Sequence, residues 1–244
     1  MLEMCYHSYM GKSKVNVLKI LISIVFGIAI LGAWGYVIWK GEPFARRYLS
    51  YGAIALCFLF SLLFIKKLPK KVFITLALAA NVAADYFLVF ANNLTDTYKL
   101  IGVCIFCGSQ LFYMLYTLSL AKGNGEKVIN LGTRVALCLI AYFILPRYLA
   151  LTVLEMIAVM YAINFVVTIF FVLLHIKTEW LTLIGMILFL LCDVHVGLVN
   201  GGINALGITG DFANFLTSRD WAYYVYTPGV FLIALSSVVA KKKD

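Results

Sequence analysis

Long apolar runs separated by short polar breaks dominate the chain. Eight runs have the length of a membrane span, and they lie near residues 17–39, 49–65, 72–91, 98–121, 131–146, 149–174, 180–200 and 222–240. About 20 apolar residues in a helix cross the hydrocarbon core of a bilayer, and open strands there would leave backbone groups unpaired. The pattern predicts an all-α polytopic membrane protein. We expect a bundle of about eight transmembrane helices that forms a single transmembrane domain over residues 1–244.

The fifth run is the least regular, because Arg134 interrupts its beginning and Pro146 closes it. Seven spans is therefore the competing count. Composition agrees with a membrane protein, since 64% of the residues are hydrophobic and 13% are charged, whereas about 45–50% of the residues of a globular protein are apolar.

The basic residues predict the orientation of the chain. With the N-terminus inside, most of the 20 Lys and Arg residues fall on the inner side, namely Lys12, Lys14, Lys19, Lys66, Lys67, Lys70, Lys71, Lys122, Lys127, Arg134, Lys177, Lys241, Lys242 and Lys243. Cytoplasmic loops carry such an excess, so we expect both termini in the cytoplasm. Because these residues cluster at span ends, they indicate contact with lipid headgroups and no nucleic-acid partner. The membrane is the plasma membrane if the source is bacterial and the endoplasmic reticulum if it is eukaryotic.

Two aspartates lie deep inside apolar runs. Asp85 stands in NVAADYFLVFANN and Asp193 in LFLLCDVHVGLVNGG. Carboxylates at such depth are costly, rare and usually functional. The competing interpretation is a structural aspartate that a neighbouring amide or hydroxyl satisfies. On the predicted topology the two aspartates lie in the third and seventh spans at equal depth, roughly 10 Å from the outer end.

Amide side chains accompany both aspartates. Asn92 follows Asp85 by seven residues, and Asn200 follows Asp193 by seven residues. A regular α-helix places each such pair on one face, two turns apart. Asn81 lies one turn before Asp85 on the same face.

Polar side chains in other spans extend the candidate site. Gln110 and Tyr113 are three residues apart in the fourth run and share a helical face. Tyr226 lies in the eighth run. Glu155 stands near the end of its run, where a carboxylate reaches the interface, so it ranks below the aspartates.

The motifs around these residues resemble those of a known family. The stretch around Asp85, GVCIFCGSQLFYMLYTL in the fourth run, GMILFLLCDVHVGL in the seventh and YTPGVFLIALS in the eighth are similar to the YhhN/TMEM86 family of lysoplasmalogenases. The similarity extends from about residue 45 onward and implies an eight-span fold with functional aspartates at Asp85 and Asp193. Three features depart from the family pattern: Gln110 replaces a histidine found in many members, His195 replaces an apolar residue, and the Lys-Pro pair that often begins the second span is absent around Arg46 to Ser50.

The resemblance implies hydrolysis of the vinyl ether bond of a lysoplasmalogen to a fatty aldehyde and a glycerophospho-base. One carboxyl must protonate the alkenyl carbon and another must assist water, as paired carboxyls in an apolar site can do. The catalytic residues implied are Asp85 and Asp193, and nearby Asn81 favours Asp85 as the ionised partner. The substrate-binding residues expected are Asn81, Asn92, Gln110, Tyr113, Asn200 and Tyr226. This scheme requires no metal and no cofactor, and the expected partners are a lysophospholipid substrate and membrane lipids.

Two other functions use the same residues. Carboxylates at one depth also suit a proton- or cation-coupled transporter of small molecules or lipids. Such a transporter would have spans broken by Gly or Pro at mid-membrane, whereas we expect all four prolines, Pro43, Pro69, Pro146 and Pro228, at or near span ends. The other alternative is a catalytically inactive lipid-binding relative, which the departures at Gln110 and His195 favour.

Overall fold

The computed structural model describes the chain over residues 2–42, 45–64, 69–91, 96–149, 151–199, 209–218 and 221–239, with side chains described from Ile20 onward. Eight of its helices are long and apolar enough to cross a membrane. These spans cover Ile20–Lys40, Arg46–Leu63, Lys70–Ala91, Thr97–Leu120, Asn124–Arg147, Val153–Leu173, Ile176–Gly197 and Trp221–Val238. The predicted all-α membrane fold with eight spans is confirmed.

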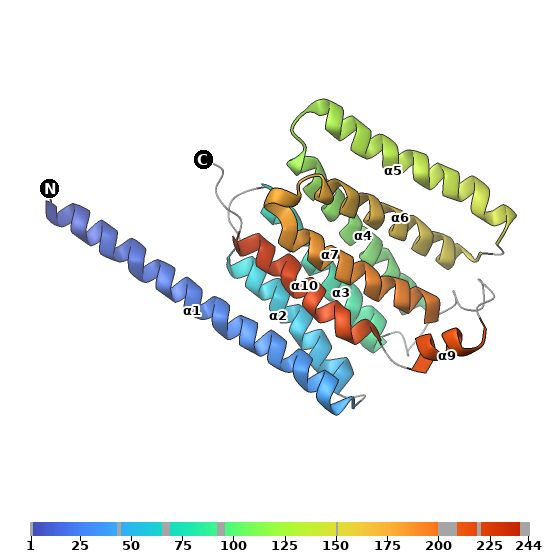
Figure 1. Cartoon of the computed structure of the whole chain (residues 1–244), viewed down its shortest axis with the longest axis horizontal. Helices are drawn as coiled ribbons and strands as arrows, with labels where there is room; N and C mark the ends of the chain where they lie inside the picture. The colour runs from blue at the N-terminus through green and yellow to red at the C-terminus, as the bar shows by residue number, and fades with distance from the viewer. Residues whose placement is uncertain are drawn as a thin grey trace.

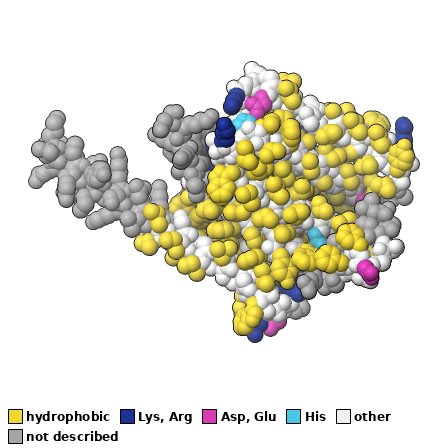
Figure 2. All heavy atoms as spheres, viewed as in Figure 1, with side chains coloured by type: hydrophobic (Ala, Val, Ile, Leu, Met, Phe, Trp, Pro, Cys, Tyr) yellow, Lys and Arg dark blue, Asp and Glu magenta, His cyan; other side chains and the backbone are white. Residues whose placement is uncertain are grey.

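The helices follow one another as an antiparallel bundle. They are α1 (Leu2–Lys40), α2 (Ser50–Leu63), α3 (Pro69–Tyr86), α4 (Asp96–Leu120), α5 (Asn124–Ile144), α6 (Val153–Leu173), α7 (Ile176–Gly197), the short α9 (Asp211–Ser218) and α10 (Trp221–Val239). Figure 1 shows α1 beside α2 at one edge, α5 against α6 at the opposite edge, and α7 beside α10 between them. The surface in Figure 2 is largely hydrophobic, with most visible charged side chains near its edges, as a lipid-facing surface requires.

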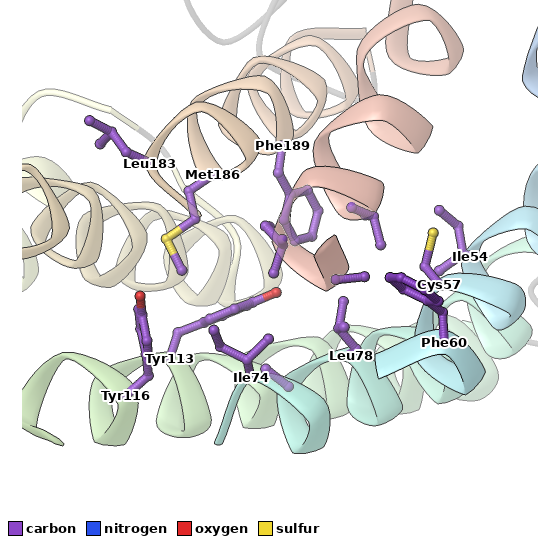
Figure 3. Packing of buried hydrophobic residues seen from close by; sticks show 14 of the residues in the cluster. Ile54, Cys57, Phe60, Ile74, Leu78, Tyr113, Tyr116, Leu183, Met186 and Phe189 are labelled. Atoms are coloured by element: carbon purple, nitrogen blue, oxygen red, sulfur yellow. The ribbon is translucent and has the colours of Figure 1, made fainter. Parts of the chain in front are cut away.

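Buried side chains from seven of the helices form the core. Representative members are Ile30 of α1, Ile54 of α2, Ile74 of α3, Tyr113 of α4, Phe165 of α6, Phe189 of α7 and Ile233 of α10. Figure 3 shows Met186 and Phe189 of α7 reaching toward Tyr113 of α4. Among the described residues, α5 contributes none to this cluster.

A glycine contact sets the close approach of α7 and α10. A Cβ atom added at Gly185 would lie 2.7 Å from the backbone oxygen of Gly229, and one added at Gly229 would lie 2.9 Å from the backbone oxygen of Gly185. Without a hydrophobic driving force between helices in lipid, small residues that let backbones pack closely supply much of the attraction. The two glycines therefore fix the central helix pair of the bundle.

The structure corrects the beginning of the fifth span. The prediction began it at residue 131, but α5 begins at Asn124. Arg134, the residue that made this span the least regular, lies inside the helix and is 3% exposed. The Arg134 guanidinium donates hydrogen bonds at 2.8–3.3 Å to oxygens of Thr117, Asn130, Asn164 and Thr168. A buried arginine is tolerated here because its donors are satisfied, and it ties α5 to α4 and α6.

The expected position of one proline is also wrong. Pro228 lies inside α10, seven residues after its beginning at Trp221, rather than near the end of the span. A proline within a helix lacks the N–H that would bond the preceding turn, and neighbouring helices make such a position acceptable in a membrane. Pro69 begins α3 and Pro146 lies in the 3₁₀ turn after α5, as expected, while Pro43 lies outside the described residues.

Candidate active site

Asp85 is held by a tyrosine from another helix. It lies in the last turn of α3, is 8% exposed, and its Oδ2 accepts a 2.6 Å hydrogen bond from the hydroxyl of Tyr226 in α10. Directly after it, α3 widens into the π-helical turn Phe87–Ala91. Such π-turns occur often at functional sites, because the wider turn redirects the side chains around it.

Asp193 has the same kind of partner. Its Oδ2 accepts a 2.5 Å hydrogen bond from the hydroxyl of Tyr161 in α6. The helix that carries Asp193 also ends in π-helical backbone, at residues 198 and 199. Tyr161 was not among the residues selected from the sequence. Its hydroxyl lies midway along an apolar span, the same signal that marked Tyr226, and nothing else in the sequence distinguishes it from other membrane tyrosines.

Two phenylalanines connect the two aspartate–tyrosine pairs. The ring of Phe106 lies 5.1 Å from the ring of Tyr161 and 5.7 Å from that of Phe189, measured between centroids. The ring of Phe189 lies 5.2 Å from that of Tyr226. These ring contacts run without a break from Tyr161 through Phe106 and Phe189 to Tyr226. The two aspartate–tyrosine pairs are therefore connected through an aromatic cluster inside the bundle.

Asn81 bonds to a tyrosine rather than to the neighbouring aspartate. Its Nδ2 donates to the hydroxyl of Tyr113 at 3.3 Å, which brings these two predicted substrate-binding residues together. The reason for preferring Asp85 as the ionised partner was an adjacent amide. Since Asn81 directs its donor to Tyr113, that reason finds no support in the structure.

Gln110 faces the interior of the bundle, and its amide has no hydrogen-bond partner among the described residues. It lies between Phe106 and Tyr113 on one face of α4, since residues 106, 110, 113 and 117 recur at helical spacing. Phe106 and Tyr113 both pack inward, against Tyr161 and Phe165 respectively. The Gln110 side chain is buried, and neither its amide oxygen nor its amide nitrogen has a hydrogen-bond partner among the described residues.

Two predicted binding residues, Asn92 and Asn200, lie outside the described residues, as do residues 201–208. The described backbone before each of them is π-helical, over Phe87–Ala91 in one case and at residues 198 and 199 in the other. A π-turn holds more residues than an α-turn. The expected role of Asn92 and Asn200 in substrate binding stays a prediction.

Glu155 has a structural partner at the beginning of α6. It forms a capping box with Thr152: the Thr152 side chain accepts from the Glu155 N–H, and the Glu155 carboxylate accepts from the Thr152 N–H. This reciprocal arrangement satisfies two backbone donors that a helix terminus otherwise leaves unpaired. Glu155 is thus occupied at the helix end, away from the aspartates.

A second polar cluster closes the other end of the bundle. Glu179 accepts hydrogen bonds from Lys70 at 2.6 Å and from the Tyr116 hydroxyl at 2.9 Å. Its backbone is non-helical, with φ −120° and ψ 23°, which marks a kink within α7. Lys70 and Asp85 are separated by about 22 Å along α3. This cluster joins α3, α4 and α7 well away from the carboxyl pair.

The fold and the site together define a class: a polytopic helical membrane protein with two carboxyls inside its bundle, each bonded to a tyrosine of a neighbouring helix. The chain belongs to the YhhN family, whose model matches residues 46–237. That range contains both aspartates and both tyrosines that bond to them. No curated protein and no solved structure gave a significant match to the chain.

Proposed function

We propose that the protein is a lysoplasmalogenase-like hydrolase, which cleaves the vinyl ether bond of a lysoplasmalogen within the membrane. The YhhN family includes lysoplasmalogenases, and this chain matches the family over most of its length. The observation that carries the proposal is that Asp85 and Asp193 each bond to a tyrosine, and that Phe106 and Phe189 connect these two tyrosines by ring contacts. Acid and base catalysis on one bond requires two carboxyls that both reach the same substrate.

The reaction needs one protonated carboxyl and one ionised carboxyl. The protonated group donates its proton to the alkenyl carbon that is not bonded to oxygen, and the C=C electron pair forms the new C–H bond. The resulting oxocarbenium ion is neutralised by water, which adds to the oxygen-bearing carbon as the second carboxylate accepts a proton. The hemiacetal then collapses to the aldehyde: its hydroxyl proton passes to the first carboxylate, the bond from carbon to the glycerol oxygen breaks, and the second carboxyl gives its proton to that oxygen, which leaves as an alcohol. One water is consumed, and both carboxyls return to their initial states.

The neighbouring side chains have supporting roles in this proposal. Tyr226 and Tyr161 orient the carboxyl oxygens through their hydrogen bonds to Asp85 and Asp193. Catalytic groups that are already fixed in position contribute to the rate, because no entropy is lost in fixing them during the reaction. Phe106, which is partly exposed, provides apolar surface against which an alkenyl chain packs, and the fully buried Phe189 supports its ring from behind. An aromatic site also stabilises a developing positive charge through the faces of its rings.

Product identity tests the proposed function. Purified protein is incubated with three lysolipids that share a headgroup: a 1-alkenyl ether, a 1-acyl ester and a saturated 1-alkyl ether. We expect fatty aldehyde and glycerophospho-base in equal amounts from the alkenyl lipid, and no aldehyde from the other two. A transporter or an inactive lipid-binding relative would release no aldehyde from any of them.

A further inference from the structure

The amide of Gln110 is a buried polar group that the fold leaves unexplained. The side chain is 5% exposed, and neither Oε1 nor Nε2 has a hydrogen-bond partner among the described residues. Asn81 adds a third such atom: its Nδ2 donates to Tyr113, but its buried Oδ1 accepts no hydrogen bond from the described part of the chain. Buried polar groups are nearly always paired, because an unpaired group has lost its water and gained nothing. These three atoms are therefore available to form hydrogen bonds with a ligand.

The packing of α3 against α4 brings Gln110 to the level of the carboxyl site. Asn81 bonds to Tyr113, and nearer the C-terminal end of α3 Leu88 packs where a Cβ atom would stand on Gly102, so the two helices are antiparallel. One turn from Asn81 toward the C-terminal end of α3 lies Asp85. Almost one turn from Tyr113 in the same direction in space, toward the N-terminal end of α4, lies Gln110. Gln110 thus lies close to the level of Asn81 and Asp85.

We propose that Gln110 and Asn81 form a subsite for a neutral hydroxyl of the substrate. The unpartnered atoms offer two acceptors and one donor, and a hydroxyl group both donates and accepts one hydrogen bond or more. A phosphate would bring charge into a site where these two side chains offer only neutral dipoles, at a large desolvation cost. Building on the proposed function, the group bound is the free hydroxyl on the central glycerol carbon, which a lysolipid has and a diacyl lipid lacks.

This subsite would select lysolipids over lipids that are acylated at that carbon. A site with buried hydrogen-bonding groups rejects a ligand that lacks the matching hydroxyl, because its own polar atoms stay unpaired. Gln110 is then a specificity-determining residue, with Asn81 as its second member. The aspartates would still perform the chemistry.

Binding of uncleavable lipids tests this assignment. The probes are a saturated 1-alkyl ether lysolipid with the free hydroxyl and its analogue with hydrogen in place of that hydroxyl, measured by displacement of a fluorescent lysolipid from protein in nanodiscs. The wild-type protein should bind the hydroxyl lipid about 10-fold more tightly. Gln110→Met keeps the side-chain length and removes both polar atoms, so the ratio of the two affinities should fall close to one.

Thr227→Val is the matched control. Thr227 also has a buried hydroxyl oxygen that bonds to nothing in the described part of the chain, but it points about 100° around α10 from Tyr226, the residue that bonds to Asp85. This variant should keep the 10-fold preference. Two results would overturn the proposal. The first is that the wild-type protein binds both lipids equally, as expected if a water molecule bonds to the Gln110 amide. The second is that Gln110→Met keeps the preference for the hydroxyl lipid.

The probes also separate this inference from the proposed function. Neither lipid contains a vinyl ether, so the affinity ratio is obtained whether or not the protein hydrolyses anything. Absence of aldehyde from the alkenyl lipid contradicts the proposed hydrolase, whereas loss of the affinity ratio contradicts only the hydroxyl subsite.

Discussion

The hydroxyl of Tyr226 lies 2.6 Å from Oδ2 of Asp85, although the two residues are 141 positions apart in the chain. This contact joins α3 to α10 at the level of the carboxyl site. Tyr161 and Asp193 repeat it between α6 and α7. Each candidate catalytic carboxyl therefore depends on a tyrosine of another helix for its orientation, and the following predictions begin with those tyrosines.

Tyr226→Phe and Tyr161→Phe should each lower the turnover of the alkenyl lysolipid by about 10- to 100-fold. The change removes one hydrogen bond to a carboxyl, and a hydrogen bond to a charged group contributes about 1.5–3 kcal/mol. The measurement is the rate of aldehyde release at saturating lipid. Tyr142→Phe removes an exposed hydroxyl of α5 and serves as the control. Wild-type turnover in both site variants would refute a positioning role.

Gly185→Ala should destabilise the bundle by about 1–3 kcal/mol, because overpacking forces apart groups that cannot shift cheaply. The new Cβ atom would stand 2.7 Å from a backbone oxygen of α10. Thermal unfolding in detergent measures the effect. Gly132→Ala is the matched control, since a Cβ atom at Gly132 meets nothing within 4 Å. Equal unfolding temperatures for the two variants would show that α7 and α10 do not pack as described.

Arg134→Met should lower the unfolding temperature clearly, because it removes the donors that satisfy oxygens of α4, α5 and α6. A buried acceptor left unpaired costs about 1–3 kcal/mol. Arg134→Lys should not restore stability, since an ammonium cannot reproduce the planar fork of a guanidinium. Arg147→Met alters an exposed arginine and should leave the temperature unchanged. Full stability of Arg134→Lys would contradict this role.

Lys70 and Glu179 should show energetic coupling in a double-mutant cycle. Lys70→Met, Glu179→Gln and the double variant are compared by chemical unfolding, and we expect an interaction free energy of about 0.5–3 kcal/mol. The lower half of that range is favoured because the Lys70 side chain is 26% exposed, although that of Glu179 is only 2% exposed. Strictly additive effects would mean that the ion pair does not fasten the end of the bundle.

The sequence predicts the fold well because the bilayer limits the choices. Span number follows from apolar runs, and confirmed helices cover all eight of them. The predicted beginning of the fifth span was wrong by seven residues. Arg134, which made that span the least regular, has its hydrogen-bonding groups satisfied inside the helix by partners on α4 and α6. Whether an arginine in an apolar run lies inside the helix can be decided only when its hydrogen-bond partners are known, and those partners come from other helices.

The candidate site is only partly predictable for a similar reason. The cost of a buried carboxyl marks Asp85 and Asp193 in the sequence alone. Tyr161 has no comparable signal, since a membrane tyrosine is ordinary until its hydrogen bond is known. The residue spacing of an α-helix also does not apply where the helix changes type, as in the π-turn after Asp85. Contacts between helices, rather than patterns within one, determine which polar groups meet.

The most direct test of the central claim is aldehyde release by Asp85→Asn and Asp193→Asn. Each substitution keeps the size of the side chain but removes the acid or base function, so both variants should lose activity on the alkenyl lysolipid by about 1,000-fold or more. Their elution as folded protein in detergent should match the wild type, and Glu42→Gln, which alters an exposed carboxyl, should retain full activity. Full aldehyde release by both folded aspartate variants would contradict catalysis by the pair.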